Sequence, residues 1–232
     1  LYKDAQIRKV LIMKRKNLVL LWAVLKFSFV FHSCLGSTSY DLQPMGKLNK
    51  IEVGLEKGEL MGFGQIRGSF NRMKGQIVFS TKNSSATSGN ILIDSSSLRF
   101  GYKKVNEDAQ QQDWLDSTKF PEISFQLQGL RKEYWGKETL QAEAFGILFL
   151  KRYKAQISFP VNLKFLRAER RKYDGKRGDI ILIKGQISLS RGQLGIQPGG
   201  MLDVIKDNLN IKVTLVGCSD KNRPLLPSRL FL

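Results

Sequence analysis

Three carboxylates lie close together in the sequence, at Asp108, Asp113 and Asp116. A pair of carboxylates can act as general acid and general base in hydrolysis, so a two-carboxylate hydrolase is one chemistry that this spacing allows. The stretch 103–117 that holds them is rich in helix-forming residues, and acidic residues on a solvated helix face need no catalytic role. We favour the solvated face. If the protein were a hydrolase, Asp113→Asn should abolish its activity.

Other catalytic groups are scarce. The chain has one histidine, His32, and two cysteines, Cys34 and Cys218. Residues 37–232 therefore contain no imidazole that could serve as a base, a metal ligand or the partner of a nucleophile. Two cysteines are too few for a metal cluster. The sequence predicts a protein that is not an enzyme, has no metal site and uses no catalytic cofactor.

Residues 1–36 have the order of a secretory signal. After Met13 the sequence reads KRKNLVLLWAVLKFSFVFHSCLGSTS, a basic start followed by an apolar run and small residues. We expect an upstream extension and a cleaved export signal, although a retained membrane anchor is the alternative. Cleavage after Gly36 would leave Ser37 first, whereas Cys34 is a candidate for lipidation. The prediction is an exported, periplasmic protein, with lipid anchoring at a bacterial envelope membrane left open.

The charge balance is strongly basic. Lys and Arg number 38 against 20 Asp and Glu, and outside residues 1–36 the numbers are 31 and 19. Such a surface suits anionic membranes, anionic polymers or nucleic acid. Basic residues gather at 102–104, 131–135, 150–154 and 167–177, some beside aromatic residues, as in single-strand binders. These runs fall mostly in expected turns and the signal directs the chain out of the cell, so nucleic acid is not the predicted partner.

From Ile51 onward apolar and polar residues alternate, which is typical of strands with one buried face. The clearest strands are 122–128, 155–166, 179–190 and 208–217, and weaker ones lie at 50–55, 64–70, 75–81, 90–98 and 139–150. We predict one domain, residues 37–220, and leave the tail 221–232 unassigned.

Turns and helices complete the expected fold. Asp174-Gly175 predicts a hairpin between two strong strands, and helical patterns cover 103–117 and, as a short turn, 199–209. Glycines recur at 62, 64, 68 and 75, where they favour the bends of a curled sheet. The fold class is all-β: an extended antiparallel barrel of about eight strands with one or two short helices. Such a barrel is either filled by side chains or lined around a ligand, and alternation alone favours a filled core.

The order of several segments resembles the YceI-like family of exported lipocalin-like, polyisoprenoid-binding proteins. The matching segments, spread over about residues 40–217, are SYDLQP, IRGSFNRMKGQIVFS, NILIDSSSLRF, EDAQQQDWLDSTKFPEISFQ and GDIILIKGQISLSRGQLGIQPGGMLDVIKDNLNIKVTLVG. The family often carries histidines where this chain reads LEKGEL, EDAQQQDWL and LKRYKAQ, so roles that depend on them do not transfer.

The resemblance implies a lipocalin-like eight-stranded barrel that holds a lipid such as a polyisoprenoid or a quinone without catalysis. The expected lining is Trp114, Phe125, Phe159, Phe165, Ile183, Ile187, Ile211 and Val213. The headgroup candidates are Arg67, Lys151 and Arg152. A second hypothesis stays open, a basic surface-interaction protein with a filled core that contacts an anionic membrane or polymer. A homodimer is compatible with either.

Overall fold

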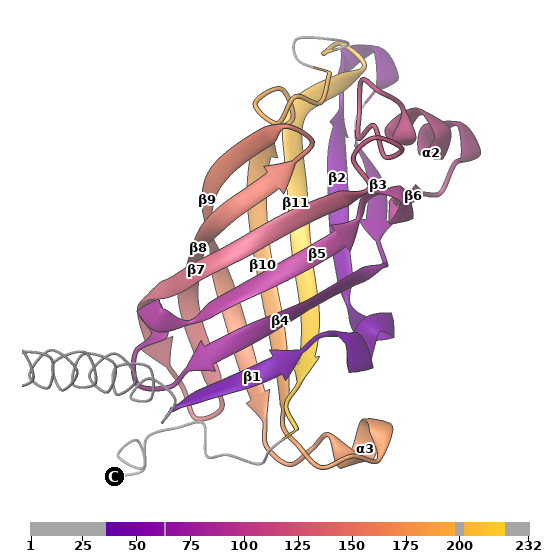
Figure 1. Cartoon of the computed structure of the whole chain (residues 1–232). Helices are drawn as coiled ribbons and strands as arrows, with labels where there is room; N and C mark the ends of the chain where they lie inside the picture. The colour runs from indigo at the N-terminus through magenta and orange to yellow at the C-terminus, as the bar shows by residue number, and fades with distance from the viewer. Residues whose placement is uncertain (1–35, 63, 198–201, 221–232) are drawn as a thin grey trace, which may run out of the picture. The chain divides into compact units, whose positions relative to one another are not determined.

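The computed structural model describes residues 36–62, 64–197 and 202–220. The predictions for Cys34, the export signal and the tail 221–232 concern residues outside these ranges. The described part is an antiparallel β-barrel that begins at Ser37 (Figure 1). Among the described residues, no helix combines the length and the hydropathy that a bilayer-crossing segment requires.

Eight strands close the ring, and the predicted all-β barrel is confirmed. Around the ring each strand pairs antiparallel with the next, from β1 through β4, β5, β7, β8, β9, β10 and β11, and β11 returns to β1 at Asp41 and Cys218. Their bounds are β1 Ser37–Asp41, β4 Met73–Ser80, β5 Ser88–Asp94, β7 Glu122–Trp135, β8 Thr139–Leu150, β9 Tyr153–Leu166, β10 Ile180–Ser190 and β11 Ile205–Cys218.

Three further strands, β2 Lys50–Lys57, β3 Gln65–Phe70 and β6 Arg99–Phe100, extend the sheet beyond the ring. In the chain, β2 follows β1 after a break, β6 follows β5, and β3 comes just before β4. The 3₁₀ helix η1 (Gln43–Leu48), which has Pro44 in its first turn, separates β1 from β2, and η4 (Ser95–Ser97) separates β5 from β6. The sequence predicts β2, β3 and β4 as separate strands, at 50–55, 64–70 and 75–81. Its strand at 90–98 runs through the break at η4, because alternation continues across it, and it predicts no strand at β1.

The two ends of the barrel are built differently, and we name each after its helix. The α2 end carries the described turn residues 58–62 with 64, 101–121, 151–152, 191–197 and 202–204, with the helix α2 (Lys103–Gln110) and the turn η2 (Glu59–Met61). The α3 end carries 81–87, 136–138 and 167–179, with η3 (Ser84–Ala86) and α3 (Arg171–Asp174). At the α2 end β6 pairs with β3 alone among the described strands, and α2 lies beside them (Figure 1).

The first helix is shorter than predicted. The pattern predicts a helix to residue 117, but α2 ends at Gln110. Beyond it the backbone forms irregular turns, in which the amide of Leu115 donates to the carbonyl of Ala109 and Asp116 has a φ of 49°. The second predicted turn, 199–209, lies partly outside the described residues, and its later part belongs to β11.

The predicted hairpin around Asp174-Gly175 does join two paired strands, because β9 and β10 are neighbours. The connection is not a tight turn, however, since α3 occupies its centre. Gly175 ends α3 with a φ of 76°, a left-handed conformation that glycine adopts without steric cost.

Candidate ligand-binding cavity

The barrel encloses an apolar cavity of about 180 Å³. Inward-facing side chains of the sheet supply most of its wall, and only Thr87 among the 32 described lining residues has a polar side chain. The hydroxyl oxygen of Thr87 accepts a hydrogen bond from the amide of Ser80, so this group is already bonded. The interior is therefore neither filled nor polar, which argues against the filled core that alternation alone favours.

Strand register explains why the predicted residues meet in this wall. Ile183 lies opposite Leu163, and Ile187 lies opposite Ile211, so alternate residues of β9, β10 and β11 share the inner face. Gly185 lies between the two isoleucines, and a Cβ atom there would come within 2.9 Å of the Phe159 ring. The missing side chain leaves the space that this ring fills.

Rings from three strands close the α3 end. Phe79 and Phe165 are buried with ring centroids 5.0 Å apart, and the ring of Trp135 stacks on Phe165 at 6.0 Å with an interplanar angle of 16°. The centroid of Trp135 is 6.1 Å from that of Phe79. We call these three residues the aromatic plug. None of the three lines the cavity, so they fill the barrel beyond it at this end, and strands hold all of them.

Loops close the α2 end, where Trp114, Leu115, Leu194 and Ile196 face the cavity. They belong to two segments, 111–117 and 191–197, which we call the lid. The amide of Gln197 donates to the carbonyl of Asp113 at 2.8 Å and joins the segments directly. No strand pairing among the described residues holds the lid in place, so it is the part of the wall that can open with the least loss of sheet.

Lys151 ties both lid segments to the β8–β9 turn. Its Nζ donates to the carbonyl oxygens of Gln112 at 3.0 Å, Trp114 at 2.9 Å and Gly195 at 3.3 Å. Three charge-assisted bonds use the three donors of one ammonium group, so Lys151 has a structural task at the lid.

Arg191 is fully buried at the root of the second lid segment. Its guanidinium donates to the carbonyl oxygens of Ile196, Gln197, Ile205 and Lys206 at 2.9–3.3 Å, and it lies 5.9 Å from the centroid of the Trp114 ring. Burial lowers the pKa of Arg191, while the nearby Asp207 carboxylate acts in the opposite direction. The arginine thus holds the loop between β10 and β11 together from inside.

Seven of the eight residues predicted to line the cavity do so: Trp114, Phe125, Phe159, Ile183, Ile187, Ile211 and Val213. Phe165 does not belong to the wall. It faces inward, as the alternation of β9 requires, but lies beyond the cavity floor in the aromatic plug. Alternation identifies the face of a strand that a residue occupies and carries no information about its depth along the barrel axis.

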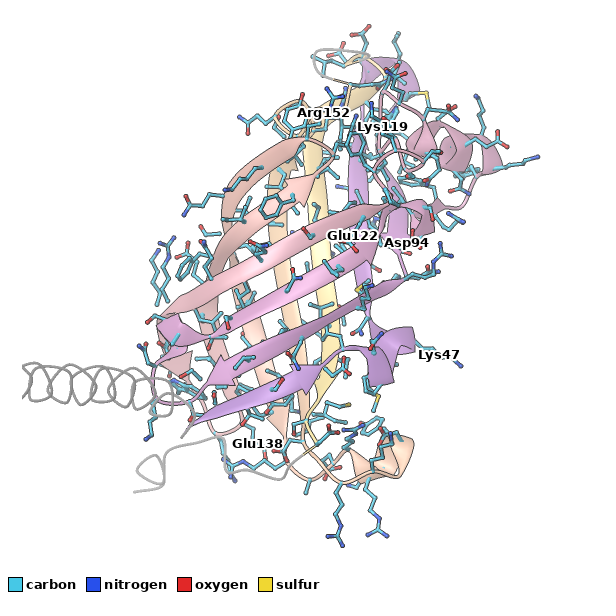
Figure 2. All side chains as sticks on the ribbon, viewed as in Figure 1. Lys47, Asp94, Lys119, Glu122, Glu138 and Arg152 are labelled. Atoms are coloured by element: carbon cyan, nitrogen blue, oxygen red, sulfur yellow. The ribbon has the colours of Figure 1, made fainter. Side chains whose placement is uncertain are left out.

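The headgroup candidates are not brought together. Arg67 lies on β3 and lines a hollow on the outer face of the barrel, so its prediction at the mouth is corrected. Lys151 is at the α2 end but is bonded to the lid. Arg152 is exposed at the same end (Figure 2). Sequence reasoning missed Arg191, since its partners are backbone carbonyls that leave no sequence signal.

The three aspartates near α2 take part in local structure, Asp108 through its carboxylate and the other two through their backbone carbonyls. Asp108 pairs with Lys104 at 2.7 Å, the carbonyl of Asp113 accepts the lid bond from Gln197, and the carbonyl of Asp116 accepts from the amides of Lys119 and Phe120. Within the ranges that the structure describes, no group of three or more His, Cys, Asp or Glu residues could hold a metal ion. Cys218 is buried, and burial raises the pKa of its thiol.

Residues 42–217 match the YceI-like domain family. The chain belongs to this family. A search of curated proteins finds no match to its sequence. The resemblance inferred from the sequence is thereby confirmed at the level of the family, over nearly the range expected.

Solved structures similar to this YceI-like protein share its fold at low identity. The BcnA protein of Burkholderia cenocepacia is 19% identical, with a TM-score of 0.59 over 72% of this chain and 95% of that one. The YceI protein of Campylobacter jejuni is 14% identical, with a TM-score of 0.58 over 69% and 88%. A polyisoprenoid-binding domain from Saccharophagus degradans is 12% identical, with a TM-score of 0.58 over 78% and 98%.

Proposed function

We propose that this YceI-like protein is an exported carrier that holds the apolar chain of a lipid, such as a polyisoprenoid or a quinone, inside its barrel. The cavity carries the proposal, since 31 of its 32 described lining residues are apolar. The family, and the name of the Saccharophagus degradans domain as polyisoprenoid-binding, support this ligand class.

Apolar burial supplies the binding energy. At about 0.8 kcal/mol per buried CH₂ group, a five-carbon isoprene unit contributes up to about 4 kcal/mol. A few buried units then offset the cost of immobilising the chain, which is of order 4–15 kcal/mol. The cavity of about 180 Å³ is smaller than the roughly 300–1,000 Å³ of common ligand pockets, so a long chain must displace lining side chains or the lid.

The ligand enters with its tail toward the aromatic plug and its head at the α2 end. This orientation follows from the different closures, because sheet residues form the floor at one end and loops form the lid at the other. Side chains of the wall offer neither a general acid nor a nucleophile beyond the bonded Thr87. We therefore assign the cavity to retention and release of the lipid rather than to its conversion.

Export is part of the proposal and rests on the residues of 1–36. Fractionation of a bacterial host followed by mass spectrometry of the intact chain tests it. An N-terminus at Ser37 in the periplasmic fraction supports cleavage, and an acylated Cys34 in a membrane fraction supports anchoring. The full-length chain recovered from the cytoplasm would contradict export.

The carrier itself is tested by mass spectrometry of an organic extract of the purified protein, beside an unrelated exported barrel. We expect one isoprenoid or quinone per protein molecule in the first extract and none in the second. An empty extract, repeated after incubation with membrane lipids, would overturn the carrier.

A further inference from the structure

The outer face of the sheet carries a second hollow, of about 210 Å³, across β11, β2, β3 and β6. Its centre is Gly54, which lies opposite Arg67 on β3 and Asn210 on β11. A Cβ atom at Gly54 would lie 3.3 Å from Oε1 of Gln65 and 3.5 Å from the carbonyl oxygen of Asn210. The missing side chain thus creates the hollow between neighbouring strands, which we call the outer groove.

Strand register brings basic residues from all four strands to this groove. Lys212 lies opposite Glu52, Glu52 opposite Ser69, and Ser69 opposite Arg99. With Lys50 and Arg67, the groove has four cationic side chains and one carboxylate. These residues are far apart in the sequence, and none of the basic runs predicted from it contains them.

The single carboxylate is committed to one cation. Glu52 accepts a bond from Nζ of Lys50 at 2.6 Å. This bond is the main cause that lowers the pKa of Glu52, and the charges of Lys212 and Arg67 act in the same direction. Arg67 and Lys212 form no ion pair with any described residue. Their charges, together with that of Arg99, leave the groove strongly positive.

The other groove side chains indicate which anion fits. Gln65 and Ser69 offer an amide and a hydroxyl group between the cations, and these suit ligands that carry hydroxyl groups as well as acidic groups. The amide of Asn210 is already bonded to Glu56 and Ser188. The described lining contains no aromatic ring on which a nucleic acid base could stack. Its one aliphatic residue, Val53, faces the inner cavity as well, so the groove has no apolar surface for insertion into a bilayer.

We propose that the outer groove binds the acidic groups of a linear anionic polysaccharide. This inference goes beyond the carrier, because the two sites occupy opposite faces of the same strand. In β2, Ile51, Val53 and Leu55 face the cavity, while Lys50, Glu52 and Gly54 face the groove. The barrel would thus hold a lipid inside while its wall is bound to a polymer outside.

Heparin oligosaccharide of uniform length, carrying a fluorescent label, is the probe, and the full chain is titrated with it at low salt. The groove variant is Arg67→Glu with Lys212→Glu. Its matched control is Lys176→Glu with Arg177→Glu, which changes the net charge equally at exposed residues of the α3 end. We expect the groove variant to weaken binding by about tenfold or more and the control by about twofold or less.

A second variant separates shape from charge. Gly54→Leu fills the hollow and leaves every cation in place, so it should weaken heparin binding while the salt dependence stays that of the parent protein. Thermal melting of each variant shows whether it is folded, and lipid content, measured separately, reports on the carrier alone. An unaltered affinity of a folded Gly54→Leu protein would contradict a built site.

Two further outcomes would overturn the proposal. An equal loss of affinity in the groove variant and in its control would show that heparin responds to net charge alone. Tighter binding of a single-stranded oligonucleotide than of heparin, lost in the groove variant, would assign the groove to a different polymer. Labelled dextran, which has no charge, should not bind any of these proteins.

Discussion

The ammonium of Lys151 lies 2.9 Å from the carbonyl oxygen of Trp114, and through this bond the β8–β9 turn holds the aromatic residue that covers the cavity. The same ammonium reaches the other lid segment at Gly195. No strand pairing among the described residues closes the α2 end, so the bonds of Lys151 are a main contribution to its closure.

Lys151→Met should loosen the lid. Methionine has a similar length and cannot donate to the three carbonyl oxygens, so we expect the release of a bound fluorescent isoprenoid to become about tenfold faster, in line with bonds to a charged group worth about 1.5–3 kcal/mol. Stopped-flow transfer of the lipid to vesicles measures the rate. Arg152→Met, at the exposed neighbouring residue, is the control, and equal rates for the two variants would contradict the role of Lys151.

Ala144→Phe should block the cavity. Ala144 is buried and lines the wall on β8, so a phenyl ring there occupies the space of the ligand. The organic extract of this variant should contain little or no lipid, while its melting temperature stays close to that of the parent protein because the cavity has room for the ring. Gln156→Phe, on the exposed side of β9, adds the same ring outside and should leave the lipid content unchanged.

Arg191→Met should destabilise the barrel. The change leaves the carbonyl oxygens of Ile196, Gln197, Ile205 and Lys206 without this donor, and each buried acceptor that stays unsatisfied costs about 1–3 kcal/mol. Urea unfolding followed by Trp fluorescence measures the loss. Arg72→Met breaks an exposed pair with Asp94 and should cost at most about 1 kcal/mol. Equal losses of stability in the two variants would show that the bonds of Arg191 contribute no more than an exposed ion pair.

Acid should weaken one ion-pair cluster on the barrel wall. Arg131, followed by Lys132, holds the pKa of Glu143 at about 2, below its ordinary value of about 4.3 in an unfolded chain. Because the folded pKa is the lower one, the stabilisation is complete well above pH ~4.3 and is lost as the pH falls toward ~2.

Comparison with Glu143→Gln isolates this contribution. The parent protein should be the more stable of the two near neutral pH, and the difference between their urea midpoints should shrink as the pH falls below about 4 and disappear below about 2. A difference that stays constant over this range would contradict the assigned pKa.

The cavity wall could be predicted from the sequence because a strand has a period of two residues. Phe159 and Val161 share a face with Leu163 whatever the details of the fold, and register then aligns that face with Ile183. The lid could not be predicted in the same way. Lys151 and Arg191 bind backbone carbonyls, and such acceptors are present at every residue.

The position of Arg67 shows a second limit. Its charge suggests a headgroup partner near the mouth, but its side of the pleat faces outward beside Gly54. The outer groove combines residues from β2, β3, β6 and β11, so it depends on which strands are neighbours. Pairing of this kind links distant parts of the chain and has no local sequence pattern.

In the proposed carrier, the aromatic plug would limit the length of the bound lipid. Phe79, Phe165 and Trp135 would limit how far a tail can advance, while the lid would lie at the head. A tail shorter than this span would leave part of the wall without contact, and a longer one would have to displace the lid or leave its last carbons in water. The protein would then select lipids by the number of their isoprene units, as a gauge of fixed depth, with no need to recognise the chemistry of the head.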